Sequence, residues 1–282
     1  MSTSVIVIIL GSAVLHAVWN AIIKGGTDKL LETSLKALGA ALLMLCGIPF
    51  LPLPAPASWP FLAGTACLHL FYYLFMAYAY KSSDMSYVYT LMRGSSPLFT
   101  ALFTVCVLEH SLSSGGWAGV VLLSSAILAM AFDSLRRGDF RIAPTALALA
   151  NSLVIMGYTV MDGSGVRLAG EPLAYICWVS FLNYFPITIF VLCRRGIRAY
   201  SGYLKTRWKY GITGGVCSAV AYGLAVWCMN HAPISQVAAL RETSVVFGML
   251  MAVVFLKEKM TPPRVAAVFT VLIGATVMRL YS

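Results

Sequence analysis

Long apolar stretches alternate with short polar ones over the whole chain. A membrane-spanning helix needs about 20 mostly apolar residues, and that length predicts ten spans. They cover residues 4–22, 33–53, 60–80, 86–108, 115–132, 143–162, 172–193, 211–230, 233–256 and 262–280. Prolines between Pro49 and Pro60 separate the second span from the third, because proline interrupts a helical pattern. The hydropathy pattern therefore predicts an all-α integral membrane protein with ten transmembrane helices.

Two stretches, 85–110 and 233–259, resemble each other. Each begins with a polar turn, carries a buried arginine, continues into an apolar run and ends near a glutamate. At an offset of 149 residues, Ser86 aligns with Ser235. Five spans per half would invert the second half relative to the first, which is an arrangement of many secondary transporters. We therefore expect two inverted five-helix repeats, 1–139 and 140–282.

The composition supports a membrane protein. The 282 residues are 60% hydrophobic and only 11% charged, whereas a soluble domain has about 25% charged residues. The net charge of +10 does not indicate nucleic-acid binding, because basic and aromatic residues do not interleave in any patch. Instead, 16 of the 20 lysines and arginines fall in the odd-numbered loops. The positive-inside rule then places these loops in the cytoplasm and both termini outside.

Motifs for catalysis or metal binding are missing from the sequence. The seven cysteines lie in or at the ends of apolar segments without a CxxC spacing, and neither HExxH nor GxSxG occurs. We therefore expect no cofactor, no metal site and no catalytic residue. A non-transporting intramembrane enzyme is the alternative from another functional class.

Three charged residues lie well inside predicted spans, where charge is costly and indicates function. Arg93 lies in the fourth span and is suited to hold a carboxylate or phosphonate. Glu242 lies in the ninth span and could bind a cationic group or a coupling proton. Arg241 is about 100° away from Glu242 around the helix, so the two side chains cannot point the same way. The alternative is an internal ion pair that only joins helices.

Polar and aromatic residues also form patches on single helix faces. His16, Trp19 and Asn20 share a face of the first span through their i, i+3, i+4 spacing. Two other patches are a stripe on the third span, His69, Tyr73, Met76 and Tyr80, and a face of the sixth span, Asn151, Tyr158 and Asp162. From these patches we expect His16, Trp19, Asn20, Tyr73 and Tyr158 to bind substrate, with ordinary helix packing as the alternative.

Several segments carry a family resemblance. HAVWNAIIKGG near the start, VCVLEH at the end of the fourth span and ALRETSVVFG with VFLKEK in the ninth resemble the EamA family of the drug/metabolite transporter superfamily. Glu109 and Glu258 match the glutamate with which the family's repeats end their fourth helix. Pro97 matches a family proline in the first half, but the second half has Val245 and Val246 there.

The resemblance implies an inner-membrane permease with a central cavity. Together with Arg93 and Glu242, it predicts a secondary active transporter that moves an amino-acid-like zwitterion or organic anion by alternating access. A proton-coupled exporter of cationic or lipophilic drugs is the alternative. We expect a monomer in the lipid bilayer, because ten spans can enclose a cavity without a partner.

Overall fold

The computed structural model describes residues 3–106, 113–137, 141–232, 234–258 and 261–281. Over these ranges the secondary structure is entirely helical, which confirms the expected all-α class. Glu109, which aligns with Glu258 in the repeat, lies outside the described residues.

The helices follow one another with short connections. They are α1 (Thr3–Gly25), α2 (Lys29–Leu45), the 3₁₀ turns η1 (Ile48–Phe50) and η2 (Pro56–Ser58), α3 (Trp59–Ser82), α4 (Met85–Cys106), α5 (Ser114–Arg136), α6 (Ile142–Leu168), α7 (Pro172–Leu182), α8 (Tyr184–His231), α9 (Ile234–Arg241), α10 (Ser244–Val254) and α11 (Pro262–Tyr281). Within the described residues, five segments are long and apolar enough to cross a membrane: Thr3–Gly25, Lys29–Phe50, Pro56–Ser82, Ile142–Leu168 and Pro172–His231. The count of ten spans stays a prediction.

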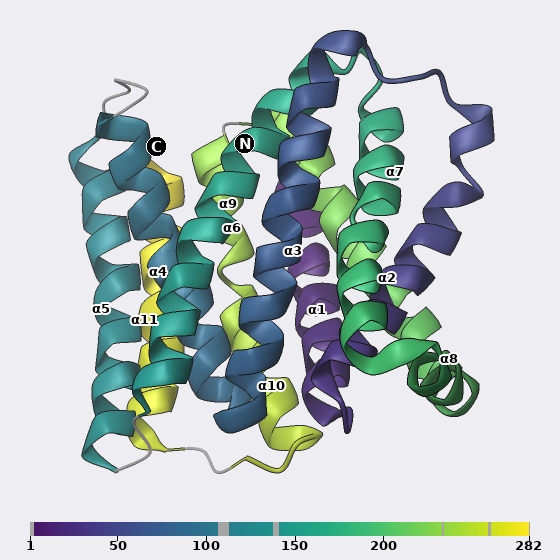
Figure 1. Ribbon diagram of the computed structural model, residues 1–282. Helices are drawn as coiled ribbons and strands as arrows, with labels where there is room; N and C mark the ends of the chain where they lie inside the picture. The colour runs from purple at the N-terminus through teal and green to yellow at the C-terminus, as the bar shows by residue number, and fades with distance from the viewer. Residues whose placement is uncertain (1–2, 107–112, 138–140, 233, 259–260, 282) are drawn as a thin grey trace.

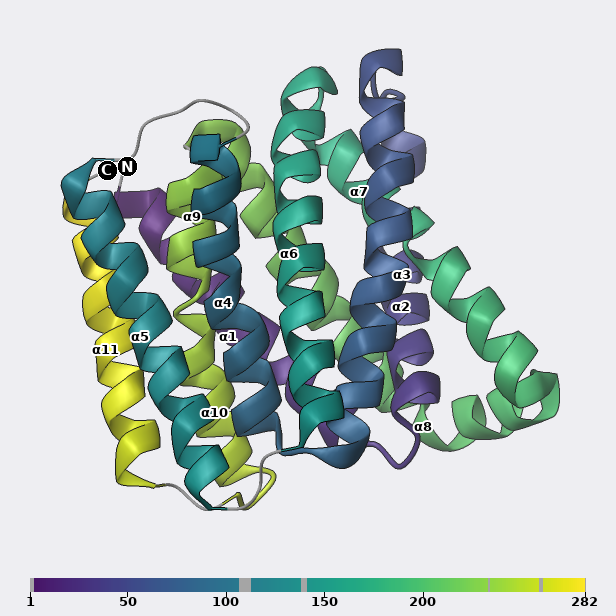
Figure 2. The same cartoon turned by 60° about the vertical axis from the view of Figure 1, so that its left-hand side comes forward.

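Most helices lie side by side, and the chain runs up and down between the two ends of the bundle (Figure 1). Both termini lie at the same end. The connections α1–α2, α3–α4, α5–α6 and α10–α11 lie at the other end, together with the bend in α8 (Figure 2). These are the connections that carry most of the lysines and arginines, so the basic residues gather at one end of the bundle.

The predicted span 233–256 is two helices rather than one. α9 ends at Arg241 and α10 begins at Ser244, so the interruption falls at Glu242 and Thr243. The backbone tightens there, because the Thr243 and Val245 N–H groups donate to carbonyls three residues earlier. The interruption therefore puts Glu242 at a helix break and not within a regular helix.

The predicted seventh span and the loop after it also differ from expectation. The helix breaks at Asn183, and α8 then continues through residues 194–210, where we expected a loop. Gly196 has φ 78° and ψ 159°, which lets the chain turn sharply inside α8. The segment after Gly196 runs across the end of the bundle before α8 turns back along it (Figure 2).

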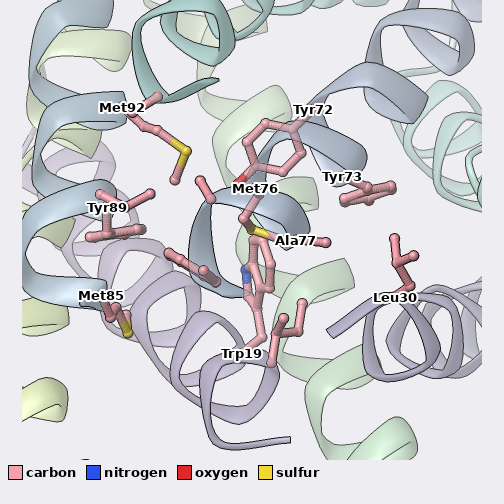
Figure 3. Close-up of a cluster of buried hydrophobic side chains, with 14 of the residues drawn as sticks. Trp19, Leu30, Tyr72, Tyr73, Met76, Ala77, Met85, Tyr89 and Met92 are labelled. Carbon is pink, nitrogen blue, oxygen red and sulfur yellow. The ribbon is translucent and has the colours of Figure 1, made fainter. Parts of the chain in front are cut away.

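Two contacts between helices position the site. α2 and α8 approach closely because both use glycine: a Cβ atom on Gly39 would lie 2.4 Å from the Gly211 carbonyl oxygen, and one on Gly215 would lie 2.4 Å from the Ala40 nitrogen. The largest buried cluster lies beside this contact and joins α1, α2, α3, α4, α6, α8 and α10. Four of its aromatic side chains, Trp19, Tyr72, Tyr73 and Tyr89, gather around Met76 and Ala77 of α3 (Figure 3).

Candidate functional site

Arg93 of α4 and Glu242 form a buried ion pair. Arg93 Nη2 lies 3.3 Å from Glu242 Oε1, and the two side chains are 1% and 4% exposed. The same Nη2 donates to the Arg241 carbonyl oxygen at 3.3 Å. The guanidinium therefore holds both the carboxylate and the C-terminal end of α9, where helix carbonyls lack partners within the helix.

The Arg241 side chain has different surroundings from this pair, although Arg241 directly precedes Glu242 in the chain. Its side chain is buried and helps to line a cavity. No carboxylate in the described residues lies within 4 Å of its guanidinium, whereas Arg93 has Glu242. Arg241 is thus a buried cation without an ion-pair partner in the described part of the chain.

The cavity lies among α1, α2, α3, α6, α7, α8 and α9. It has a volume of about 30 Å³, which is room for a water molecule but not for an organic substrate. The residues that line it include His16, Trp19, His69, Tyr72, Tyr73, Tyr158, Asn183, Ser218, Tyr222 and Arg241. A substrate could enter only if these side chains or helices moved apart.

Aromatic rings meet at His69 of α3. The ring centroids of Tyr158 and Tyr222 lie 4.4 Å and 5.3 Å from that of His69. His69 Nδ1 forms a hydrogen bond with the Thr65 carbonyl oxygen at 3.0 Å, which fixes the ring plane. On the other side of the cavity, His16 packs edge-on against Trp19 with centroids 4.9 Å apart. The walls therefore offer flat rings and a guanidinium to anything that binds between them.

The structure brings five of the predicted substrate-binding residues to this cavity and leaves three outside its lining. The five are His16, Trp19, Tyr73, Tyr158 and Arg241. Asn20 is fully buried, donates to the His16 carbonyl oxygen and accepts the Tyr80 hydroxyl at 3.0 Å. Arg93 and Glu242 lie nearby, bound to each other.

The comparisons with known proteins agree with the sequence-based resemblance. The sequence model of the EamA-like transporter family matches residues 144–280. Residues 144–280, just under half of the chain, are thus similar to that family. The earlier resemblance to the EamA family is thus confirmed over that stretch, and the chain is a multi-pass membrane protein.

Two known proteins are similar to this chain. A riboflavin transporter of Brucella anthropi is 36% identical over 117 residues, which are 41% of this chain and 39% of that protein. The match thus spans well under half of the curated relative. A crystal structure superposes with a TM-score of 0.70 at 15% sequence identity, covering 99% of both chains. At that identity the likeness shows a shared fold alone.

The cavity uses residues from inside and outside the matched EamA-like stretch. Tyr158, Tyr222 and Arg241 lie within residues 144–280, whereas His16 and His69 precede it. The site is therefore built between the matched domain and the part of the chain before it.

Tyr222 is a lining residue that sequence reasoning missed, and its position depends on Asp162. The Asp162 carboxylate is buried and accepts hydrogen bonds from Thr65 Oγ1 at 2.8 Å, the Tyr175 hydroxyl at 3.0 Å and the Tyr222 hydroxyl. Asp162 itself does not line the cavity. Asp162 instead holds Tyr222, one of the aromatic residues that line the cavity, through the tyrosine hydroxyl.

Lys36 also differs from expectation. Lys36 is one of the 16 basic residues counted with the odd-numbered loops, although the predicted span 33–53 already includes it. The structure puts it inside α2, where it is 1% exposed. The loop ends earlier than its polar composition suggested, because Asp28 caps α2 by accepting from the Leu30 and Leu31 N–H groups. A helix that starts at Lys29 carries Lys36 two turns into the bundle.

Proposed function

We propose that this chain is a secondary transporter that moves a small polar metabolite, an amino-acid-like zwitterion or an organic anion, across the inner membrane. One observation carries the proposal: Arg241 is a buried guanidinium on the wall of an aromatic cavity and has no carboxylate within 4 Å in the described residues. Charged groups inside a membrane bundle commonly mark substrate pathways. An anionic substrate group would supply the missing counter-charge.

The helix packing supports ten spans in two inverted halves. α1 packs on α8 and α10, and α6 packs on α3 and α4. If the halves are exchanged, the first helix of each half packs on the third and fourth helices of the other. The chain also alternates in direction along the bundle (Figure 2). We propose that the halves, 1–139 and 140–282, rock about the cavity to open it alternately to each side.

We propose that the Arg93–Glu242 ion pair separates during this alternating-access cycle. In this conformation they neutralise each other at 3.3 Å. A rocking motion that moves α4 away from the α9–α10 break would free both side chains. Arg93 could then hold a substrate carboxylate, and Glu242 an ammonium group or a coupling proton.

The orientation follows from the basic end of the bundle. We propose that the odd-numbered loops face the cytoplasm and both termini face outward, because lysines and arginines mark cytoplasmic loops. We also propose a monomer as the transporting unit, because ten spans can enclose a cavity without a partner.

The name of the matched relative from Brucella anthropi suggests a first substrate to test. That protein is called a riboflavin transporter, and riboflavin carries a flat ring system that suits a cavity lined by aromatic side chains. Riboflavin therefore joins aromatic amino acids and aryl carboxylates as a test substrate for this chain.

A cationic-drug exporter is the second candidate. It needs an unpaired acid on the cavity wall, and Glu242 is paired with Arg93 in this conformation. The unpaired Arg241 favours anionic groups over cations. An intramembrane enzyme receives no support from the family match, which is to a transporter family.

Uptake into proteoliposomes tests the proposal. The substrates are labelled aromatic amino acids, aryl carboxylates, riboflavin and the cation tetraphenylphosphonium. We expect uptake of at least one zwitterion, anion or riboflavin above that of protein-free vesicles. The variant Arg241→Met loses one charge-assisted contact with the substrate. Its uptake of a zwitterion or anion should therefore be roughly tenfold lower than that of the wild type.

Arg198→Met is the matched control, because Arg198 is exposed on α8. The Arg241 substitution spares the backbone carbonyl that Arg93 binds, so the ion pair keeps its second acceptor. Uptake of tetraphenylphosphonium alone would reject the proposal in favour of the drug exporter. Equal uptake by wild type and Arg241→Met would remove Arg241 from the site.

A further inference from the structure

The Lys36 ammonium is enclosed by an aromatic cage. Its Nζ lies 4.0 Å from the ring centroid of Tyr73 and 4.6 Å from that of Trp19. It also donates to Ser218 Oγ at 3.2 Å. Two π faces and a hydroxyl thus hold the charge, and cation–π contacts of this kind are favourable in a site without water.

Lys36 has no ion-pair partner in the described residues. Glu32 is one turn away on α2, but its carboxylate is bound by Arg207 at 3.2 Å and by the Tyr203 hydroxyl at 2.6 Å. Burying an ammonium without a counter-ion is costly. Aromatic rings offset part of this cost but leave the positive charge in place.

All three groups of the cage, Trp19, Tyr73 and Ser218, also line the candidate substrate cavity. Lys36 itself does not appear in the lining. The charge therefore lies directly behind the cavity wall, and a ligand on the cavity side of those rings would feel it through one layer of atoms.

The other buried charges leave the region positive. The described buried acids in this region are Glu32, Asp162 and Glu242, and the basic residues are Lys36, Arg93, Arg241 and the Arg207 partner of Glu32. Glu32 is paired with Arg207, Glu242 is paired with Arg93, and Asp162 is bound by three hydroxyl groups. If these four basic and three acidic groups are all ionised, one positive charge remains without compensation.

We infer that Lys36 is a specificity-determining residue that makes this cavity prefer an aromatic anion over a neutral molecule of the same shape. The inference rests on the proposed function and narrows its substrate class. The rings of the cavity would stack on a flat ligand, Arg241 would meet its acidic group, and Lys36 would act as a positioning residue through Trp19 and Tyr73. A carboxylate or phosphate attached to an aromatic ring is the chemistry that fits.

Paired ligands test this inference on the purified full-length protein. Each pair shares its ring and differs in charge: indole-3-acetate against indole-3-acetamide, and riboflavin 5′-phosphate against riboflavin. Equilibrium binding gives the affinity ratio of the anion to the neutral partner for each variant. We expect wild type to prefer the anion in at least one pair.

Lys36→Met and Lys36→Gln remove the charge but keep a side chain of similar length. We expect the preference for the anion to fall about tenfold, the size of one charge–charge interaction across a partly screened interior, while the neutral partner binds as before. Lys36→Arg should keep the preference. Lys205→Met is the control, because Lys205 is an exposed lysine of α8.

A purely structural role for Lys36 would weaken both members of a pair equally, and that result would overturn the inference while leaving the proposed function in place. An unchanged preference in Lys36→Met or Lys36→Gln would do the same. A wild-type protein that binds neither member of either pair, but transports another zwitterion, would reject the aromatic-anion class. If Lys36→Met does not fold, Lys36→Gln and Lys36→Arg still separate charge from packing.

Discussion

Arg93 on α4 and Glu242 at the break between α9 and α10 lie 3.3 Å apart, with 1% and 4% of their side chains exposed. They come from the two halves that the repeat pattern predicts. The pair therefore joins those halves at the helix break, next to the wall that carries Arg241. Separating the charges without a replacement partner would leave each of them buried and uncompensated.

Removing one partner should therefore cost more than removing both. We expect Arg93→Met and Glu242→Leu each to lower the free energy of unfolding by about 3–5 kcal/mol, as for other buried pairs that lose one charge. The double variant should be more stable than the sum of the two losses predicts. Denaturation by sodium dodecyl sulfate in mixed micelles measures the free energy of unfolding of the wild type, the two single variants and the double variant.

The exposed pair Arg137–Asp133 is the control for that cycle. It spans one helical turn at 3.0 Å, and its side chains are 44% and 11% exposed. Such a surface pair is worth less than about 1 kcal/mol, so Arg137→Met should change stability little. Additive losses for Arg93 and Glu242 would show that the two buried charges do not depend on each other.

Glu258, in the second half of the chain, caps the N-terminus of α4. Its carboxylate oxygens accept the Met85 and Ser86 N–H groups at 3.0 Å and 3.1 Å. A carboxylate at a helix N-terminus satisfies free N–H groups and favours the helix dipole. We expect Glu258→Ala to cost about 0.5–2 kcal/mol and to speed hydrogen exchange at the first turn of α4.

Glu171→Ala is a matched control for this capping contact. Glu171 accepts the Leu173 N–H group at 3.2 Å at the start of α7, so its removal should affect α7 and leave α4 unchanged. If Glu258→Ala leaves exchange at Met85–Val88 at the wild-type rate, the contact does not hold this end of α4 in solution.

Gly215 makes possible the close approach of α8 to α2. A Cβ atom there would lie 2.4 Å from the Ala40 backbone nitrogen, where no side chain can move away to make room. We expect Gly215→Ala to lower the thermal midpoint in detergent, because the two backbones must separate and lose tight packing. Gly202→Ala is the control on the same helix, since its Cβ would have no atom within 4 Å. A midpoint for Gly215→Ala equal to that of Gly202→Ala would contradict the close contact.

Sequence alone could locate the buried charges but not their partners. Arg93 and Glu242 stand out because charges are rare in apolar stretches. Their pairing depends on how α4 and the α9–α10 break are rotated toward each other, and periodicity within one helix does not contain that information. The helix break at Glu242 was missed for a related reason: neither glycine nor proline marks it.

Lys36 and Tyr222 show two other limits of predicting the site from the sequence. Lys36 lies near the start of the predicted span 33–53, so the charge count grouped it with the preceding loop, whereas the Asp28 cap puts it inside α2. Asp28, a residue type that commonly caps helices, marks this helix start in the sequence. Tyr222 is one aromatic residue among many in an apolar span, and its role is set by His69 and Asp162 from other helices.

Asp162 and Tyr222 should depend on each other, because the carboxylate holds the tyrosine at the cavity wall through its hydroxyl. Asp162→Asn keeps the size of the side chain and one acceptor oxygen, which can still accept from Thr65 and Tyr175, but an NH₂ donor replaces the oxygen that accepts from Tyr222. We expect this variant to lose about 1–3 kcal/mol of stability, the cost of leaving buried polar groups unsatisfied. Tyr222→Phe should lose less stability, because it removes one donor and leaves two.

In the double variant the loss of stability should be smaller than the sum of the two single losses. Binding of an aromatic ligand should weaken in each variant, because the Tyr222 wall beside His69 is no longer fixed. The thermal midpoint and the ligand affinity of the four proteins measure both effects. Strictly additive losses, or an unchanged affinity in Asp162→Asn, would mean that Asp162 stabilises the bundle without setting the shape of the cavity.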